Sequence, residues 1–133
     1  MAELLAQLFN GLVLGLLFGV MALGFMMILS VMEVINFSHG ALFALGAYFA
    51  LTLQKFVGYW PALILAPAFV GLLGLGIERF GIRRIYGKDP LFGLLLTLGL
   101  AMAFEEIIRI VWGKTGSSLA PPAFAAGPIN LGI

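Results

Sequence analysis

Long stretches without Asp, Glu, Lys or Arg restrict the fold of this chain more than any other feature. These stretches are residues 4–32, 34–54, 56–77 and 90–104. A membrane-spanning helix needs roughly 20 predominantly apolar residues, and each stretch supplies most or all of one. The spacing therefore predicts four transmembrane helices, over about 5–31, 40–56, 61–78 and 91–112.

The composition excludes the main soluble classes. Hydrophobic residues make up 62% of the 133 residues and charged residues 10%, whereas a soluble domain has about 25% charged residues. A net charge of +1 leaves no basic face for nucleic acid. Apolar runs such as LLLTLGLAMAF do not alternate as the strands of a membrane barrel do. We therefore expect an all-α integral membrane protein, a polytopic bundle of about four helices.

The chain also lacks the side chains that metal sites and disulfides require. It contains no cysteine and one histidine, so neither a disulfide framework nor a zinc site of the usual kind is available. We expect no metal and no cofactor.

Basic residues between the third and fourth predicted helices indicate the orientation. Four of the seven Lys and Arg residues lie there, at Arg79, Arg83, Arg84 and Lys88. Short loops rich in Lys and Arg stay in the cytoplasm, so the loop 79–90 is expected inside, with the N-terminus and the loop 57–61 outside. Residues 113–133, rich in Gly, Pro and Ser, are expected to be an incomplete extracytoplasmic loop following a transmembrane unit over 1–112.

Small residues recur four positions apart on three of the predicted helices. They are Gly11, Gly15 and Gly19 on the first, Gly40 and Ala44 on the second, and Gly93, Thr97 and Ala101 on the fourth. Residues at this spacing share a helix face and let helices approach closely in lipid. We interpret them as helix-packing faces; a pore lined by glycine is the alternative.

A polar break separates the first two predicted helices. It begins at Glu33, has no Lys or Arg, and its central residues are Asn36, Phe37, Ser38, His39 and Gly40. One interpretation places it at membrane depth, lining a solute pathway as broken helices do in transporters. The other is an ordinary tight turn in which Asn36 and Ser38 cap the second helix. For His39 we expect a neutral ring bonded to its neighbours rather than a proton relay.

Three charged residues lie toward the outer end of the fourth predicted helix. Glu105 and Arg109 stand four residues apart with the acid first, which favours an ion pair, and Glu106 is adjacent. Because they lie near one end of the helix, we expect them at the membrane interface, and their role stays open.

Short patterns in a fixed order connect the chain to a known family. They are Asn10-Gly11 with Gly15, then Ile35 to Gly40, then Gly46-Ala47-Tyr48, then Ile77-Glu78-Arg79 ahead of Arg83-Arg84. Over about residues 5–120 the chain resembles the inner-membrane permease subunits of bacterial branched-chain amino-acid ABC importers. Family members are about twice as long, so the resemblance is to their N-terminal half.

The resemblance implies a multi-pass permease subunit in the bacterial inner membrane. It implies a second permease subunit, two cytoplasmic ATPase subunits and an extracytoplasmic solute-binding protein as partners. The partner ATPases would hydrolyse ATP and drive alternating access, so this chain is not expected to be an enzyme. A permease for urea or short-chain amides and a truncated, non-transporting membrane subunit remain alternatives. The resemblance assigns no role to Glu105, Glu106 or Arg109.

Overall fold

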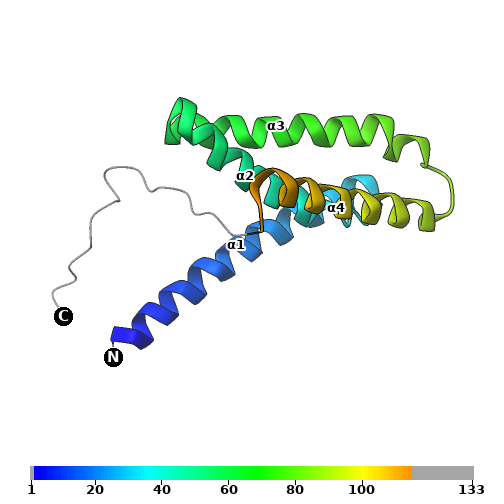
Figure 1. The fold of residues 1–133 in the computed structure, drawn as a ribbon. Helices are drawn as coiled ribbons and strands as arrows, with labels where there is room; N and C mark the ends of the chain where they lie inside the picture. Colours follow the sequence, from blue (N-terminus) through cyan, green and yellow to red (C-terminus); the bar gives the residue numbers. More distant parts are fainter. Residues whose placement is uncertain (1, 115–133) are drawn as a thin grey trace.

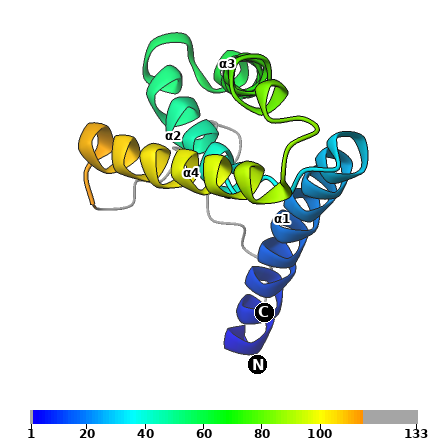
Figure 2. The same ribbon diagram turned by 90° about the vertical axis from the view of Figure 1, so that its right-hand side faces the viewer.

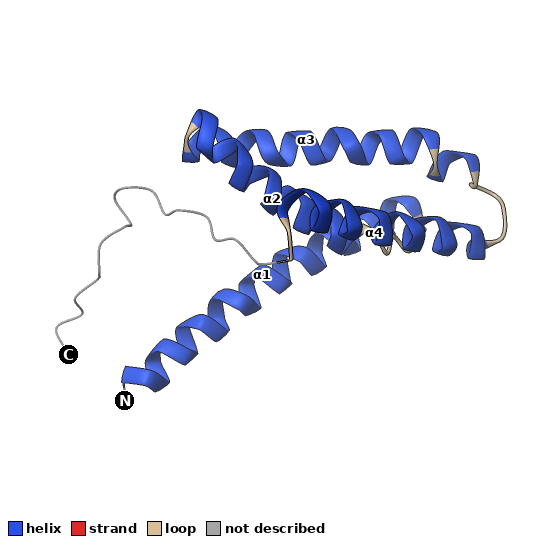
Figure 3. Ribbon diagram, viewed as in Figure 1, coloured by secondary structure: helices blue, strands red, loops and turns tan. Residues whose placement is uncertain are grey.

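The computed structural model describes residues 2–114, which form four long helices joined by short connections (Figures 1 and 3). The helices are α1 (Ala2–Met32), α2 (His39–Val57), α3 (Tyr59–Phe80) and α4 (Pro90–Trp112), with a short 3₁₀ helix, η1 (Ile82–Arg84), after α3. All four are long and apolar enough to cross a membrane. The predicted helical membrane fold is confirmed, and the largest shift in a boundary is at the start of α1, at residue 2 rather than 5.

Local sequence determines where the later helices begin and end. A single residue, Gly58 with φ +85°, joins α2 to α3, and a positive φ of this kind favours glycine. At the start of α4 the carboxylate of Asp89 accepts the Leu91 N–H at 2.9 Å. Pro90, the first residue of α4, has no N–H that would need a partner. These two connections hold α2, α3 and α4 in antiparallel succession.

The three later helices pack together, and α2 contacts both α3 and α4 (Figures 1 and 2). Small side chains let these helices approach closely. The buried residues are Ala41, Leu42 and Leu45 of α2, Ala62 and Ala66 of α3, and Gly93, Thr97, Ala101 and Ile108 of α4.

Aromatic side chains join α2, α3 and α4 near the C-terminal end of α4. The Trp112 Nε1–H donates to Thr52 Oγ1 at 2.8 Å, and that hydroxyl donates to the Tyr48 carbonyl at 3.0 Å. The ring of Phe49 lies 4.2 Å from the ring of Phe69 and 5.9 Å from that of Trp112, between centroids. The Trp112 N–H and the Thr52 hydroxyl both have hydrogen-bond partners. Burial of the cluster in an apolar environment therefore leaves neither group unsatisfied.

Helix α1 diverges from the other three helices (Figure 2). Residues 3–20 are all exposed, and partly covered positions begin only at Met21. Within residues 2–114, the main helix contact of α1 is with the start of α2. Most of α1 therefore exposes apolar side chains that no other part of residues 2–114 covers.

The end of α1 and the loop before α4 lie at the same end of the bundle, because residues 31–35 and 85–91 line one hollow. Arg79, Arg83, Arg84 and Lys88 are exposed there, and Arg83 Nε lies 3.8 Å from Glu78 Oε1. This arrangement agrees with a cytoplasmic loop at 79–90, which stays a prediction. The loop expected at 113–133 falls outside the described residues, apart from its first two.

Candidate functional site

The polar break starts where α1 ends in a left-handed residue. Glu33 has φ +52°, and its N–H donates to the Leu29 carbonyl at 2.9 Å. A left-handed residue after the last helical turn closes a helix, and glycine is the usual choice because it has no Cβ penalty. Here glutamate occupies that position, and the chain then runs without helical structure to Ser38.

Asn36 and Ser38 close the break by bonding to each other. Asn36 Oδ1 accepts the Ser38 N–H at 3.0 Å and the Ser38 Oγ–H at 2.6 Å. Both residues are buried, at 7% and 0% exposure. Ser38 is the N-cap of α2 but makes no side-chain capping bond, which corrects the expectation that its hydroxyl caps the helix. The reason is that Ser38 has helical backbone angles and its hydroxyl is turned back onto Asn36.

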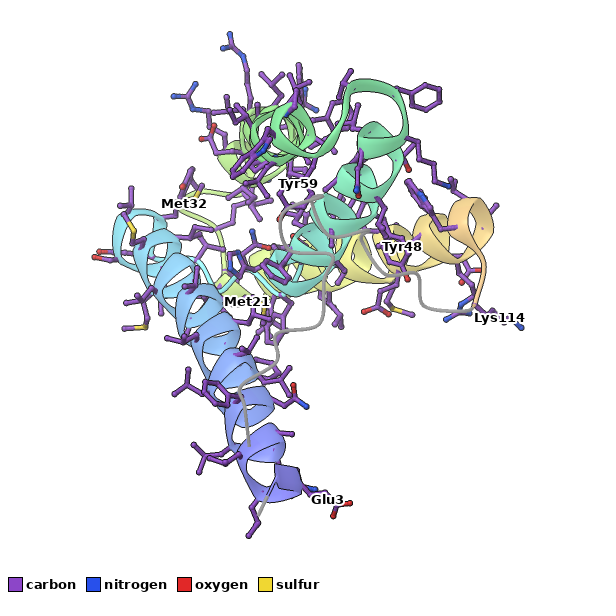
Figure 4. All side chains as sticks on the ribbon, turned by 90° about the vertical axis from the view of Figure 1, so that its left-hand side faces the viewer. Glu3, Met21, Met32, Tyr48, Tyr59 and Lys114 are labelled. Carbon is purple, nitrogen blue, oxygen red and sulfur yellow. The ribbon has the colours of Figure 1, made fainter. Side chains whose placement is uncertain are left out.

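His39 connects the start of α2 to the middle of α1. Its Nε2 lies 3.2 Å from the Met21 carbonyl oxygen, and because a carbonyl only accepts, Nε2 carries the hydrogen. Gly24 gives the ring room, since a Cβ there would lie 3.4 Å from His39 Cε1. The Phe25 ring covers the imidazole, with centroids 5.9 Å apart. Figure 4 shows Met21 well along α1 from the Glu3 end.

The other side of the break rests on α4. Thr97 is fully buried, and its Oγ1 lies 3.3 Å from the Ile35 carbonyl oxygen and 2.9 Å from that of Gly93. A Cβ on Gly93 would lie 3.2 Å from Val34 Cγ1. Successive turns of α4 therefore supply a space for Val34 and a hydroxyl for Ile35. The sequence marked Thr97 only as a small residue and gave no signal that it bonds to the break.

These contacts place the break within the length of the helices rather than at their ends. With a rise of about 1.5 Å per residue, Thr97 lies about 10 Å along α4 from Pro90, and Met21 about 16 Å along α1 from Met32. The break meets both positions. Helix α2 therefore begins inside the bundle.

The two halves of the break face different hollows. Residues 33–35 line a hollow of about 570 Å³ whose other wall is formed by 85–91, Gly93 and Leu94. Asn36, Phe37, His39 and Gly40 line a second hollow of about 460 Å³, together with Phe18, Met21, Ala22 and Phe25 of α1. Consecutive residues of the break thus line a hollow on the side of the basic loop and a second hollow against α1.

The residues predicted for helix packing fall into two groups. Gly93 and Ala101 are buried, and Ala44 is half-buried. The other members would meet no described atom within 4 Å of an added Cβ: Gly11, Gly15, Gly19 and Gly40. For this second group, packing stays a prediction that concerns partners outside residues 2–114.

The acidic pair on α4 differs from the sequence expectation. Arg109 Nη1 lies 3.0 Å from Glu106 Oε2, whereas the expected partner was Glu105. The i,i+3 position serves as well as i,i+4 on a helix surface, and both paired side chains are more than half exposed. Among residues 2–114, no three His, Cys, Asp or Glu side chains come together as a metal site would require.

Comparison with known proteins gives one family. The family described as "Branched-chain amino acid transport system / permease component" matches residues 7–125. The high-affinity branched-chain amino acid transport system permease protein LivH of Escherichia coli (strain K12) is 28% identical over 127 residues, covering 86% of this chain and 41% of that protein. Its namesake in Salmonella typhimurium is 27% identical over the same shares.

A further relative is the permease protein BraD of Pseudomonas aeruginosa, whose name assigns it to the same kind of transport system. It is 28% identical over 116 residues, which is 80% of this chain and 38% of that protein. The chain spans about two fifths of the length of these curated relatives. No solved structure matches the chain.

Proposed function

The chain belongs to the family of branched-chain amino acid transport permease components, and we propose that it forms part of the pathway by which a branched-chain amino acid crosses the bacterial inner membrane. The single observation that carries the proposal is the polar break at 33–40, which bonds to α1 and α4 within their length and lines two hollows. Broken helices at membrane depth are the usual sites of solute passage in transporters.

The chemistry of the hollow against α1 suits an aliphatic solute. Phe18, Met21, Ala22 and Phe25 supply an apolar wall, and Asn36 and His39 are the polar residues of the break that line it. Pockets for small solutes combine a mostly apolar lining with a few polar groups that fix orientation. We assign Asn36, Phe37, Ser38, His39 and Gly40 to the solute pathway.

Transport requires partners in this proposal. A second permease subunit completes the pathway, two cytoplasmic ATPase subunits hydrolyse ATP, and an extracytoplasmic binding protein delivers the solute. The basic loop at 79–90 faces the cytoplasm in this proposal, following the distribution of Lys and Arg. Lipid covers the remaining apolar surface.

Deletion of the gene tests the function and the solute together. We expect uptake of radiolabelled leucine, isoleucine and valine to fall in the deletion strain and to return when the gene is restored, while urea and acetamide uptake stays unchanged. A loss of urea or acetamide uptake instead would assign the chain to an amide permease. Unchanged uptake of all five solutes would favour a non-transporting membrane subunit.

A further inference from the structure

The polar break is bonded within itself. Its buried polar side chains, Asn36 and Ser38, bond to each other. Main-chain bonds join its ends to α1 and α2, and two hydrogen bonds that involve a side chain attach it to the helices beside it, one from His39 to the Met21 carbonyl of α1 and one from Thr97 of α4 to the Ile35 carbonyl. Its position between the hollows therefore depends on few polar attachments.

The Thr97 hydroxyl, which attaches the break to α4, has three carbonyl oxygens within hydrogen-bonding distance. Thr97 Oγ1 carries one hydrogen, and the carbonyl oxygens of Ile35, Gly93 and Leu94 lie 3.3, 2.9 and 3.3 Å away. Two of these acceptors belong to the same helix as Thr97, which is a common bonding pattern for Thr within a helix. If the break moves away, the buried hydroxyl keeps a partner and avoids the penalty of an unsatisfied donor.

The contact between the break and α4 consists of this hydrogen bond and of side-chain packing against Gly93. Gly93 lies one turn before Thr97, and Val34 occupies the space that a side chain at position 93 would fill. The packing fixes where the break rests on α4, and the hydroxyl stabilises it there. Neither contact requires a rearrangement of α4 when the break leaves.

We propose that Thr97 is a positioning residue whose hydroxyl hydrogen is shared between the Gly93 and Ile35 carbonyls, so that it helps to hold the polar break between the two hollows, and that it releases the break during transport by giving this hydrogen to the Gly93 carbonyl alone. The proposal rests on the proposed function, because it assigns the break to the solute pathway. It adds that the Thr97 hydroxyl sets how often the polar break leaves its position between the two hollows.

Thiol labelling in the assembled transporter measures how readily a reagent passes the polar break from one hollow to the other. The chain has no cysteine, so single reporters can be placed in it: Ala22→Cys in the hollow against α1 and Val31→Cys in the hollow beside the basic loop. An impermeant maleimide is applied to inside-out vesicles, and labelling of this chain is followed over time. We expect the Val31→Cys reporter to react faster than the Ala22→Cys reporter.

Thr97→Val removes the hydroxyl while keeping the shape of the side chain. We expect it to raise the labelling rate at position 22 relative to that at position 31 by roughly two- to tenfold, as the loss of one hydrogen bond implies. Thr97→Ser restores the hydroxyl and should restore the ratio. Thr52→Val is the matched control, because it removes a threonine hydroxyl from the other end of α2 and should leave the ratio unchanged.

Two results would overturn the proposal. One is an unchanged ratio in Thr97→Val with normal abundance of the complex. The other is a ratio that changes equally in Thr97→Val and Thr52→Val, which would indicate general loosening. The labelling needs no solute, so failure of the wild-type transporter to take up branched-chain amino acids would count against the proposed function and not against this role of Thr97.

Discussion

The imidazole Nε2 of His39 lies 3.2 Å from the main-chain oxygen of Met21, so the first residue of α2 is bonded to the middle of α1. Helix α1 otherwise diverges from the bundle, with residues 3–20 exposed. The angle of α1 therefore depends on a small area around one side chain. Rotation of α1 about this contact would widen or close the hollow that residues 36–40 line.

Loss of the imidazole should loosen α1. In His39→Ala the hydrogen bond to Met21 and the ring contact with Phe25 both disappear, whereas His39→Gln keeps a side-chain N–H donor. We expect the distance between spin labels at Leu8 and Phe56, measured by double electron–electron resonance, to broaden in His39→Ala and to broaden less in His39→Gln. Equal distributions in the wild type and both variants would show that other contacts fix the helix.

A side chain at position 24 should act through the same contact. The nearest atom to an added Cβ at Gly24 is His39 Cε1 at 3.4 Å, so the larger side chain of Gly24→Val displaces the ring. We expect Gly24→Val to broaden the same spin-label distance. Because the two changes remove one shared contact, their combination should broaden it little more than either alone. Additive effects would indicate that Gly24 and His39 act independently.

Replacement of Asn36 tests how the turn and pathway roles combine. Asn36→Leu removes the oxygen that accepts both the Ser38 N–H and the Ser38 hydroxyl. Leaving buried donors unsatisfied costs about 1–3 kcal/mol each, so we expect lower thermal stability in detergent and lower membrane abundance. Asn36→Asp keeps the acceptor but adds a buried carboxylate, so it should recover only part of the lost abundance. Normal abundance of Asn36→Leu with reduced uptake would mean that Asn36 serves the solute and that the turn stands without it.

The strained end of α1 offers a stabilising change. Glu33 has φ +52°, a conformation that costs a non-glycine residue roughly 1–2 kcal/mol. We expect Glu33→Gly to raise the free energy of unfolding by up to about 1 kcal/mol, since the added freedom of the unfolded chain offsets part of the relief. Glu33→Ala keeps the Cβ and should give no gain. A gain from Ala equal to that from Gly would show that the glutamate charge, and not the backbone, is the unfavourable feature.

The sequence predicted the helices well because their signal is local. Uninterrupted apolar stretches located all four helices closely, and the polar break was visible as a run of Asn, Ser and His between apolar segments. The contacts that hold the break were not predictable. Thr97 and Ile35 are 62 positions apart, and nothing in the local pattern of either residue indicates the other.

The side-chain hydrogen bonds within the break were also not predictable from the sequence. Asn36 and Ser38 are both common N-cap residues, so their types alone favoured capping of α2. Ser38 instead has helical backbone angles and makes no side-chain capping bond. Arg109 pairs with Glu106, three residues away, rather than with Glu105, four residues away, and both spacings are favourable on a helix surface, so spacing alone could not predict the partner.

Cysteine labelling in intact cells tests the orientation of the helices. The loop glycines are poor positions for reporters, because Gly58 and Gly87 have φ +85° and +78° and a side chain there is strained. Val57 and Tyr86 are 43% and 45% exposed and stand next to those glycines. Because the basic loop should stay in the cytoplasm, we expect an impermeant maleimide to label Val57→Cys in intact cells and Tyr86→Cys only after the membrane is opened. Labelling of both after opening is the control for reactivity, and the opposite pattern in intact cells would reverse the predicted topology.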